Sequence, residues 1–160
     1  MFHIILFAPQ IPPNTGNIIR LSANTGAILH LIEPIGFRLD EKSCRRAGLD
    51  YHALANLSTH KNLDDCIATL GAARLFAITS RGTVSVFDTL FAPGDAFLFG
   101  SETAGLPNEV HAEFTESQKL RLPMIAGNRS LNLGNAASIV VYEAWRQVGF
   151  TVTRKDLNFV

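Results

Sequence analysis

An arginine and two asparagines near the N-terminus have the spacing of one helix face. Asn17, Arg20 and Asn24 recur at intervals of three and four residues, which places their side chains next to one another on a helix of ~3.6 residues per turn. Two prolines precede them, and Asn14 or Thr15 could cap the helix. A guanidinium beside helix N-terminal amides suits a phosphate or a ribose edge. The same pattern also fits a capped surface helix with a solvated arginine.

A glutamate between two glycines forms a second candidate. Glu102 follows the apolar run 96–99 and lies between Gly100 and Gly105. Glycines let a backbone approach a ligand closely, although the segment also fits an ordinary strand-to-helix turn. The spacing is not that of the GxGxxG fingerprint. A dinucleotide-dependent oxidoreductase is therefore disfavoured.

A third candidate is the loop of small and polar residues that precedes the last apolar helix, in the segment 122–133. Ser130 is the expected N-cap of that helix. Asn132 is a polar position in an apolar helix, and a buried amide needs a partner. It therefore bonds to a neighbouring loop or faces a ligand, and both readings stay open.

Short apolar runs alternate with helical patterns along the chain. The expected strands are 3–7, 28–32, 74–78, 96–99 and 120–122, and the expected helices are 17–25, 41–47, 63–70, 107–113 and 131–148. This alternation predicts an α/β fold with a largely parallel sheet. Parallel sheets bind ligands at the carboxyl ends of their strands, where the three candidate segments lie.

Length and composition favour one domain, 1–160, with apolar surface to spare. Of the 160 residues, 47% are hydrophobic and 18% charged. The pattern at 131–148 is apolar around almost the whole helix, which predicts complete burial, either as a central core helix or against a second subunit. We therefore expect a homodimer.

The charge, the cysteines and the histidines of the chain limit the kinds of site and location that we expect. The formal net charge is zero, so RNA contacts must come from local clusters. Cys44 and Cys66 form no disulfide framework, and the apolar run 1–7 is too short for a signal peptide or membrane span, so we expect a cytoplasmic protein outside the membrane. The five histidines are scattered along the sequence, and their spacing predicts no metal site.

Three motifs, taken together, resemble those of the SPOUT RNA methyltransferases. They are NxGNIxR at 14–20, GSExxGL at 100–106 and LPM…SLNL at 122–133, in the family's order. The chain is most similar to small members that methylate the ribose 2'-hydroxyl of the tRNA wobble nucleotide, a cytidine or modified uridine. The resemblance implies a C-terminal deep trefoil knot, S-adenosyl-L-methionine as cofactor, tRNA and a second copy as partners, and leucine isoacceptors as substrates. A ribosomal RNA substrate and a non-catalytic cofactor-binding RNA assembly factor are the alternatives.

The resemblance also implies roles for individual residues. Arg20 would act at the hydroxyl, and because guanidinium groups stay protonated we expect it to orient and stabilise charge rather than to take the proton. Backbone near the following positions would hold the cofactor: Ile78, Gly100, Leu122, Met124, Ser130 and Leu131. Substrate or supporting roles fall to Asn14, Glu102, Arg129, Asn132 and Tyr142. If 38–46 is helical, a basic stripe for RNA forms from Arg38, Lys42, Arg45 and Arg46.

Overall fold

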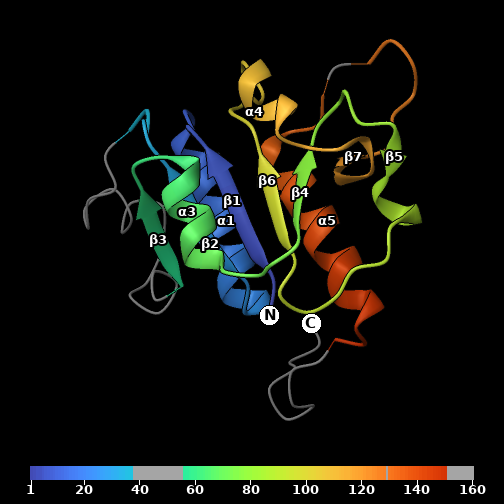
Figure 1. The fold of residues 1–160 in the computed structure, drawn as a ribbon, viewed down its shortest axis with the longest axis horizontal. Coiled ribbons are helices and arrows are strands. Elements are labelled where there is room, and N and C mark those ends of the chain that lie inside the picture. The colour runs from blue at the N-terminus through green and yellow to red at the C-terminus, as the bar shows by residue number, and fades with distance from the viewer. Residues whose placement is uncertain (38–55, 129, 151–160) are drawn as a thin grey trace.

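The computed structural model describes residues 1–37, 56–128 and 130–150 (Figure 1). The strands are β1 (His3–Phe7), β2 (Ile28–Ile32), β3 (Leu57–His60), β4 (Leu75–Ile78), β5 (Val84–Ser85), β6 (Ala96–Phe99) and β7 (Lys119–Arg121). The α-helices are α1 (Pro12–Thr25), α3 (Leu63–Leu70), α4 (Asn108–Ala112) and α5 (Leu133–Gln147). Two 3₁₀ turns are η2 (Val86–Asp88) and η3 (Glu116–Gln118).

All the paired strands run parallel, in the order β3-β2-β1-β6-β4-β7-β5. β1 lies between β2 and β6, so that Ile4 pairs with Leu29 on one side and Phe97 on the other. This confirms the expected α/β fold with a parallel sheet. The strand order is consistent with the C-terminal knot that the resemblance implies.

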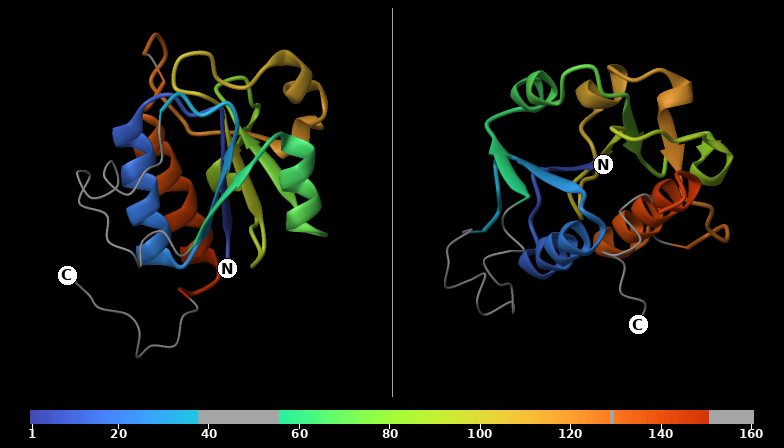
Figure 2. Two further views of the ribbon diagram at one scale, coloured as in Figure 1. Left: turned by 90° about the vertical axis from the view of Figure 1, so that its left-hand side faces the viewer. Right: turned by 90° about the horizontal axis from the view of Figure 1, so that it is seen from below.

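Helices cover both faces of the sheet. α1 and α5 lie side by side on one face, and α3 and α4 lie on the other (Figure 2). The alternation of side chains along β1 serves both layers: Ile4 and Leu6 join the core under α1 and α5, and Ile5 joins the core under α3 and α4. No helix in the described ranges is long and apolar enough to cross a membrane.

The sequence predicts the central strands better than the edges. β1, β2, β6 and α3 have the expected bounds, and β4, β7 and α4 differ from expectation by one residue at one or both ends. β3 and β5 were not expected, because Leu57–His60 is mostly polar and Val84–Ser85 has only two residues. The expected helix 41–47 lies outside the described residues.

The starts of two helices correct the sequence-based expectations. α1 begins at Pro12, not at residue 17, because prolines suit the first turn of a helix, and neither Asn14 nor Thr15 caps it. α5 begins at Leu133, and its N-cap is Asn132 rather than Ser130. The Asn132 side chain accepts hydrogen bonds from the Gly134 and Asn135 amides at 2.9 and 3.3 Å.

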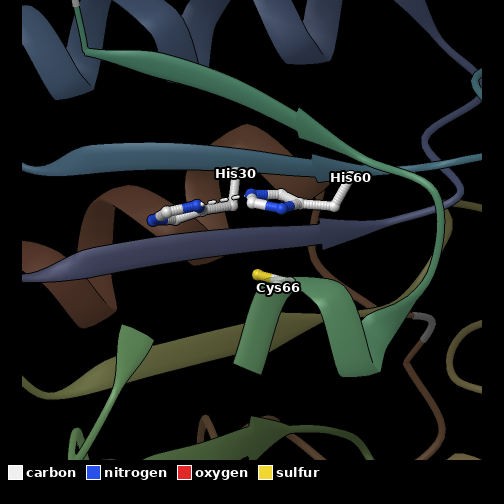
Figure 3. Close-up of side chains that lie close together, drawn as sticks. All are labelled: His30, His60 and Cys66. Carbon is white, nitrogen blue, oxygen red and sulfur yellow. Dashed lines mark hydrogen bonds between the residues drawn. The ribbon is translucent and has the colours of Figure 1, made fainter. Parts of the chain in front are cut away.

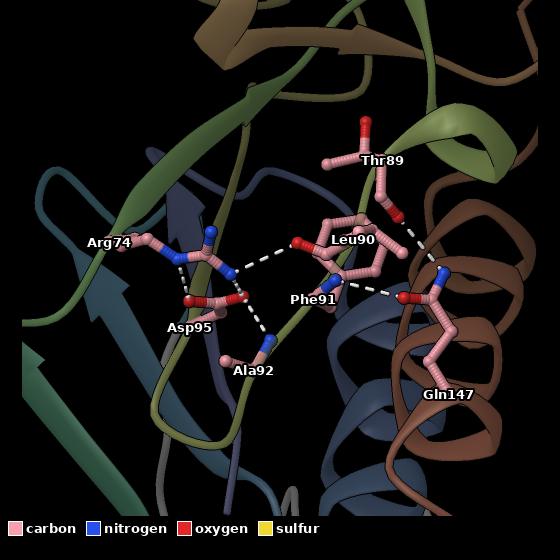
Figure 4. Close-up of polar contacts among 7 residues, drawn as sticks. All are labelled: Arg74, Thr89, Leu90, Phe91, Ala92, Asp95 and Gln147. Carbon is pink, nitrogen blue, oxygen red and sulfur yellow. Dashed lines mark hydrogen bonds and ion pairs between the residues drawn. The ribbon is translucent and has the colours of Figure 1, made fainter.

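A polar network closes the amino-terminal ends of β4 and β6 (Figure 4). Arg74 donates from Nε and Nη2 to the two carboxylate oxygens of buried Asp95, at 2.8 and 2.6 Å. The same carboxylate accepts from the Ala92 amide at 2.7 Å. Gln147 of α5 accepts from the Phe91 amide at 2.9 Å. We call Arg74, Asp95 and Gln147 the amino-end network. It ties two strands, their connecting loop and the last helix together.

Candidate active site

A cavity of about 490 Å³ lies at the carboxyl ends of β4, β6 and β7. That volume lies within the range of small-molecule and cofactor sites. Its wall includes nine of the predicted site residues: Asn14, Ile78, Gly100, Glu102, Leu122, Met124, Ser130, Leu131 and Asn132. The fold therefore brings the three candidate segments together around one space.

The Glu102 carboxylate joins the loop after β6 to the start of α1. Its Oε2 accepts from the Gln10 amide at 2.9 Å, and its Oε1 accepts from the Ile11 amide at 3.1 Å and from Asn14 Nδ2 at 3.0 Å. A negative charge is favoured at a helix N-terminus. Glu102 thus binds the two backbone amides that precede α1 and one side chain of its first turn.

These hydrogen bonds decide the ionisation of Glu102. Partial burial acts to raise the pKa of its carboxyl, but the donors from Gln10, Asn14 and Ile11 outweigh burial and hold the pKa below its ordinary value. Glu102 is therefore a carboxylate at neutral pH. It accepts hydrogen bonds and has no proton to donate to a ligand.

Asn132 extends the same network to α5. Its Nδ2 donates to Asn14 Oδ1 at 2.9 Å, while its own Oδ1 caps α5. We call Asn14, Glu102 and Asn132 the carboxyl-end network. Near it the two helices approach closely, because a Cβ built on Gly134 would lie 3.5 Å from Asn17 Cβ. The network fixes the start of α1 against the start of α5 and the loop after β6.

A tight turn after β6 forms one wall of the cavity. Ser101 and Gly105 pair across it, with N–O distances of 3.1 and 3.0 Å. A Cβ added at Gly100 would collide with the backbone of Gly105 and Leu106. Gly105 itself has φ of +70°, which favours glycine. The two glycines therefore allow the main chain to fold back on itself beside the cavity.

The remaining predicted residues lie elsewhere. Arg20 is exposed on α1 and is not part of the cavity wall. Tyr142 is exposed on α5, with its ring edge-on to Trp145 at 5.8 Å. Arg129 and the proposed basic stripe of 38–46 lie outside the described residues.

Several cavity residues were missed at the sequence level. Thr79, Ser80 and Arg81 directly follow β4, and His111 comes from α4. Arg81 Nη1 donates to Asn108 Oδ1 at 2.7 Å. Burial, with the positive charges nearby, lowers the pKa of His111. Thr79, Ser80 and Arg81 could have been found from their position at the carboxyl end of an expected strand.

One face of α5 is exposed within the described parts of this chain, so α5 is not a central core helix, and burial of that face against a second subunit stays a prediction. Ile139 is 37% and Tyr142 46% exposed, and Leu131, just before the helix, is 41% exposed. The buried face consists of Leu133, Gly134, Ala137, Val140, Val141, Ala144 and Trp145. The apolar residues of the other face meet no partner within the described parts of this chain that buries them.

The sequence is similar to a known family over most of its length. Residues 1–142 match the SpoU rRNA Methylase family. A curated protein of Burkholderia ambifaria, named tRNA (cytidine(34)-2'-O)-methyltransferase, is 58% identical over 152 residues, which cover 94% of this chain and 97% of that protein.

Solved structures share the fold. One, described as giving structural insights into the 2-OH methylation of C/U34 on tRNA, has a TM-score of 0.85 and 43% identity, covering 93% of this chain and 97% of that one. An AdoMet-bound rRNA methyltransferase from Sinorhizobium meliloti has a TM-score of 0.77 and 26% identity, covering 92% of this chain but only 56% of its own.

Proposed function

Because the chain belongs to the SpoU rRNA methylase family, we propose that it methylates the ribose 2'-hydroxyl of tRNA nucleotide 34, with S-adenosylmethionine as methyl donor. The observation that carries the proposal is 58% identity, over 94% of this chain, to a relative whose name states that reaction. The nucleotide is a cytidine or a modified uridine. Leucine isoacceptors are the substrates to test first.

The cavity fits S-adenosylmethionine. Ile78, Leu122 and Leu131 offer aliphatic walls for a purine. Beside them the backbone at Gly100 can approach a ligand closely, since the position has no side chain. When bound, the cofactor supplies a methyl group on a sulfonium whose sulfide is a good leaving group. Much of the work left to the protein is therefore to align the reacting groups.

We assign that alignment to the carboxyl-end network and Arg20. Asn14, Glu102 and Asn132 fix the direction of α1 relative to the cavity wall, and Arg20 lies six residues further along α1 than Asn14. The guanidinium of Arg20 orients the ribose hydroxyl and stabilises the charge that develops on it. Because guanidinium groups stay protonated, another group or solvent takes the proton.

The assembly is a homodimer in this proposal. The exposed apolar residues Leu131, Ile139 and Tyr142 support an interface along α5, since a second copy would remove them from water. Each copy is a single domain, 1–160, that acts in the cytoplasm. Stacking on an unpaired base is the alternative role for Tyr142, in place of a contact with the second copy.

The test compares tRNA from cells with and without the gene. Mass spectrometry of mapped tRNA fragments is expected to show loss of one 2'-O-methyl group, at nucleotide 34, in the cells that lack the gene. Wild type restores the methyl group. Arg20→Ala is expected to lower methyl transfer by on the order of 10²–10³-fold, as for loss of a charge-stabilising donor. Arg121→Ala, which alters an exposed arginine outside the cavity wall, serves as the matched control.

Other outcomes select the alternatives. Unchanged tRNA with a methyl group missing from ribosomal RNA would overturn the tRNA assignment in favour of the reaction named for the Sinorhizobium meliloti neighbour. Binding of S-adenosylmethionine without methyl transfer to any RNA would instead indicate a non-catalytic assembly factor.

A further inference from the structure

Three histidines that are far apart in the sequence form a row across β1, β2 and β3. His3 Nδ1 lies 3.0 Å from His30 Nε2, and His30 Nδ1 lies 2.9 Å from His60 Nε2. The strand register explains the row. Ile28 is opposite His3 and Ile32 is opposite His60, so each histidine is offset by two residues from the next and all three side chains lie on the same face. The sequence spacing of 27 and 30 residues hides this proximity.

A cysteine from α3 faces the same cluster. Cys66 Sγ, one ring nitrogen of His30 and one of His60 all lie within 4.8 Å of one another. Figure 3 shows the sulfur on α3 next to the imidazoles of His30 and His60. His30 is 2% exposed and Cys66 is fully buried, while His60 is half-buried. Three elements therefore present three potential metal ligands at one place.

The hydrogen bond to His3 prepares His30 for such a role. With its proton on Nε2, His30 donates to His3 Nδ1 and directs the lone pair of its own Nδ1 toward His60. Metal-binding histidines are usually held in this way, through the ring nitrogen that does not bind the ion. His3 is thus a positioning residue. Burial lowers the pKa of His30, and the neighbouring histidines lower it further, to about 4. The ring is therefore neutral at pH 7.

We propose that His30 Nδ1, His60 Nε2 and Cys66 Sγ bind a divalent transition-metal ion, with Zn²⁺ as the expected occupant. Imidazole nitrogen and thiolate sulfur are ligands that Zn²⁺ prefers, whereas Mg²⁺ and Ca²⁺ prefer oxygen. In tetrahedral coordination, His30 Nδ1 and His60 Nε2 must lie further apart than their present 2.9 Å, by on the order of 0.5 Å. A side-chain rotation can supply this shift. Water would complete the coordination.

Binding is accompanied by proton release. The Cys66 thiol gives its proton to solvent to become a thiolate, and the proton on His60 Nε2 is replaced by the metal while His60 Nδ1 takes one up. One proton is therefore released per ion.

The bound ion links β2, β3 and α3 on the side of the sheet opposite α1 and α5. It is expected to raise the thermal unfolding midpoint, because it binds the folded chain in preference to the unfolded one.

The experiment uses metal-free, full-length protein without a polyhistidine tag. Co²⁺ is the probe, since a cobalt–thiolate bond gives a near-ultraviolet charge-transfer band. One equivalent of Co²⁺ is expected to produce the band, and Zn²⁺ is expected to displace Co²⁺ and abolish it. A folded wild-type protein that shows no such band with excess Co²⁺ would overturn the proposal.

Variants separate the ligands from their surroundings. Cys66→Ala is expected to abolish the charge-transfer band, His60→Gln to weaken Co²⁺ binding at least about 10²-fold, and His3→Gln to weaken it about 10–100-fold, as for loss of a residue that orients a ligand. Cys44→Ser, at the chain's other cysteine, is the matched control and is expected to bind as wild type does. Circular dichroism checks that each variant is folded. A band that survives in Cys66→Ala, or that is lost in Cys44→Ser, would place the ion elsewhere.

Discussion

The two ends of the sheet each hold a carboxylate, but they hold it differently. At the amino end, Asp95 is paired with a cation, Arg74, and the contact closes the space between two strands and their loop. At the carboxyl end, Glu102 is held by neutral amide donors from Gln10, Ile11 and Asn14. Those amides join the start of α1 to the loop after β6, and both segments lie on the wall of a cavity that they leave open. The comparison predicts that substitutions at the amino end lower the stability of the fold, whereas substitutions at the carboxyl end weaken ligand binding.

The largest effect is expected from Gly100→Ala at the carboxyl end. The added methyl group would collide with the backbone of Gly105 and Leu106, so the turn that forms one wall of the cavity must move. We expect S-adenosylhomocysteine affinity to fall at least 10²-fold, or about 3 kcal/mol, as measured by isothermal titration calorimetry. Gly94→Ala, in an open turn at the other end of the sheet, is the control for general backbone strain. Equal loss of affinity in both variants would contradict the comparison.

Asp95→Asn, at the amino end, should lower the stability of the fold and leave ligand affinity nearly unchanged. Neutralising this buried side chain weakens the pair with Arg74, which is half exposed and partly solvated. The unfolding free energy should fall by about 2 kcal/mol, as measured by urea denaturation, while S-adenosylhomocysteine affinity stays within about twofold of wild type at temperatures where the variant is folded. A large loss of affinity at unchanged stability would show that the two ends are not separate in function.

Asn132→Ala tests whether one residue contributes both to the stability of the fold and to ligand binding. It removes the cap of α5 and the hydrogen bond to Asn14. Loss of an N-cap costs about 1 kcal/mol, so the unfolding midpoint in urea should decrease modestly. Affinity for S-adenosylhomocysteine should fall about tenfold, because the start of α1 is no longer fixed beside the cavity. Asn132→Ser keeps a capping oxygen, and is expected to recover stability but not affinity.

The smallest effect concerns pH. Hydrogen bonds from Gln10, Asn14 and Ile11 hold the pKa of Glu102 in the folded protein below its ordinary value of 4.5. The carboxylate therefore stabilises the fold above pH 4.5, and this contribution is lost as the pH falls through the folded-state pKa. Glu102→Gln should flatten the pH dependence of the unfolding free energy below pH 4.5, with a change of at most about 1 kcal/mol. If the unfolding free energy of this variant depended on pH below 4.5 as that of wild type does, the carboxylate would not be held by these hydrogen bonds.

Local sequence patterns predicted the centre of the fold and the members of the site, but not their contacts. The apolar runs at β1, β2 and β6 predicted these three strands correctly, because strands buried on both faces of a parallel sheet are nearly continuous apolar runs. Ser130 and Asn132 are both good capping residues, and the bond to Asn14 favours the second. That bond joins residues 118 positions apart. No local pattern can reveal it, nor the histidine row across β1, β2 and β3.

The carboxyl-end network also has a consequence for biosynthesis. The start of α1 leaves the ribosome early, yet its Asn14 meets Glu102 only after 88 more residues and Asn132 after 118. At ~5–20 residues per second, the delay before Asn132 is translated is roughly 6–24 s. The cavity is therefore among the last features of the protein to be completed during translation. A nascent chain stalled before Asn132 can form β1 and α1 but cannot assemble the pocket, so that only chains translated beyond this point compete for the cell's methyl donor.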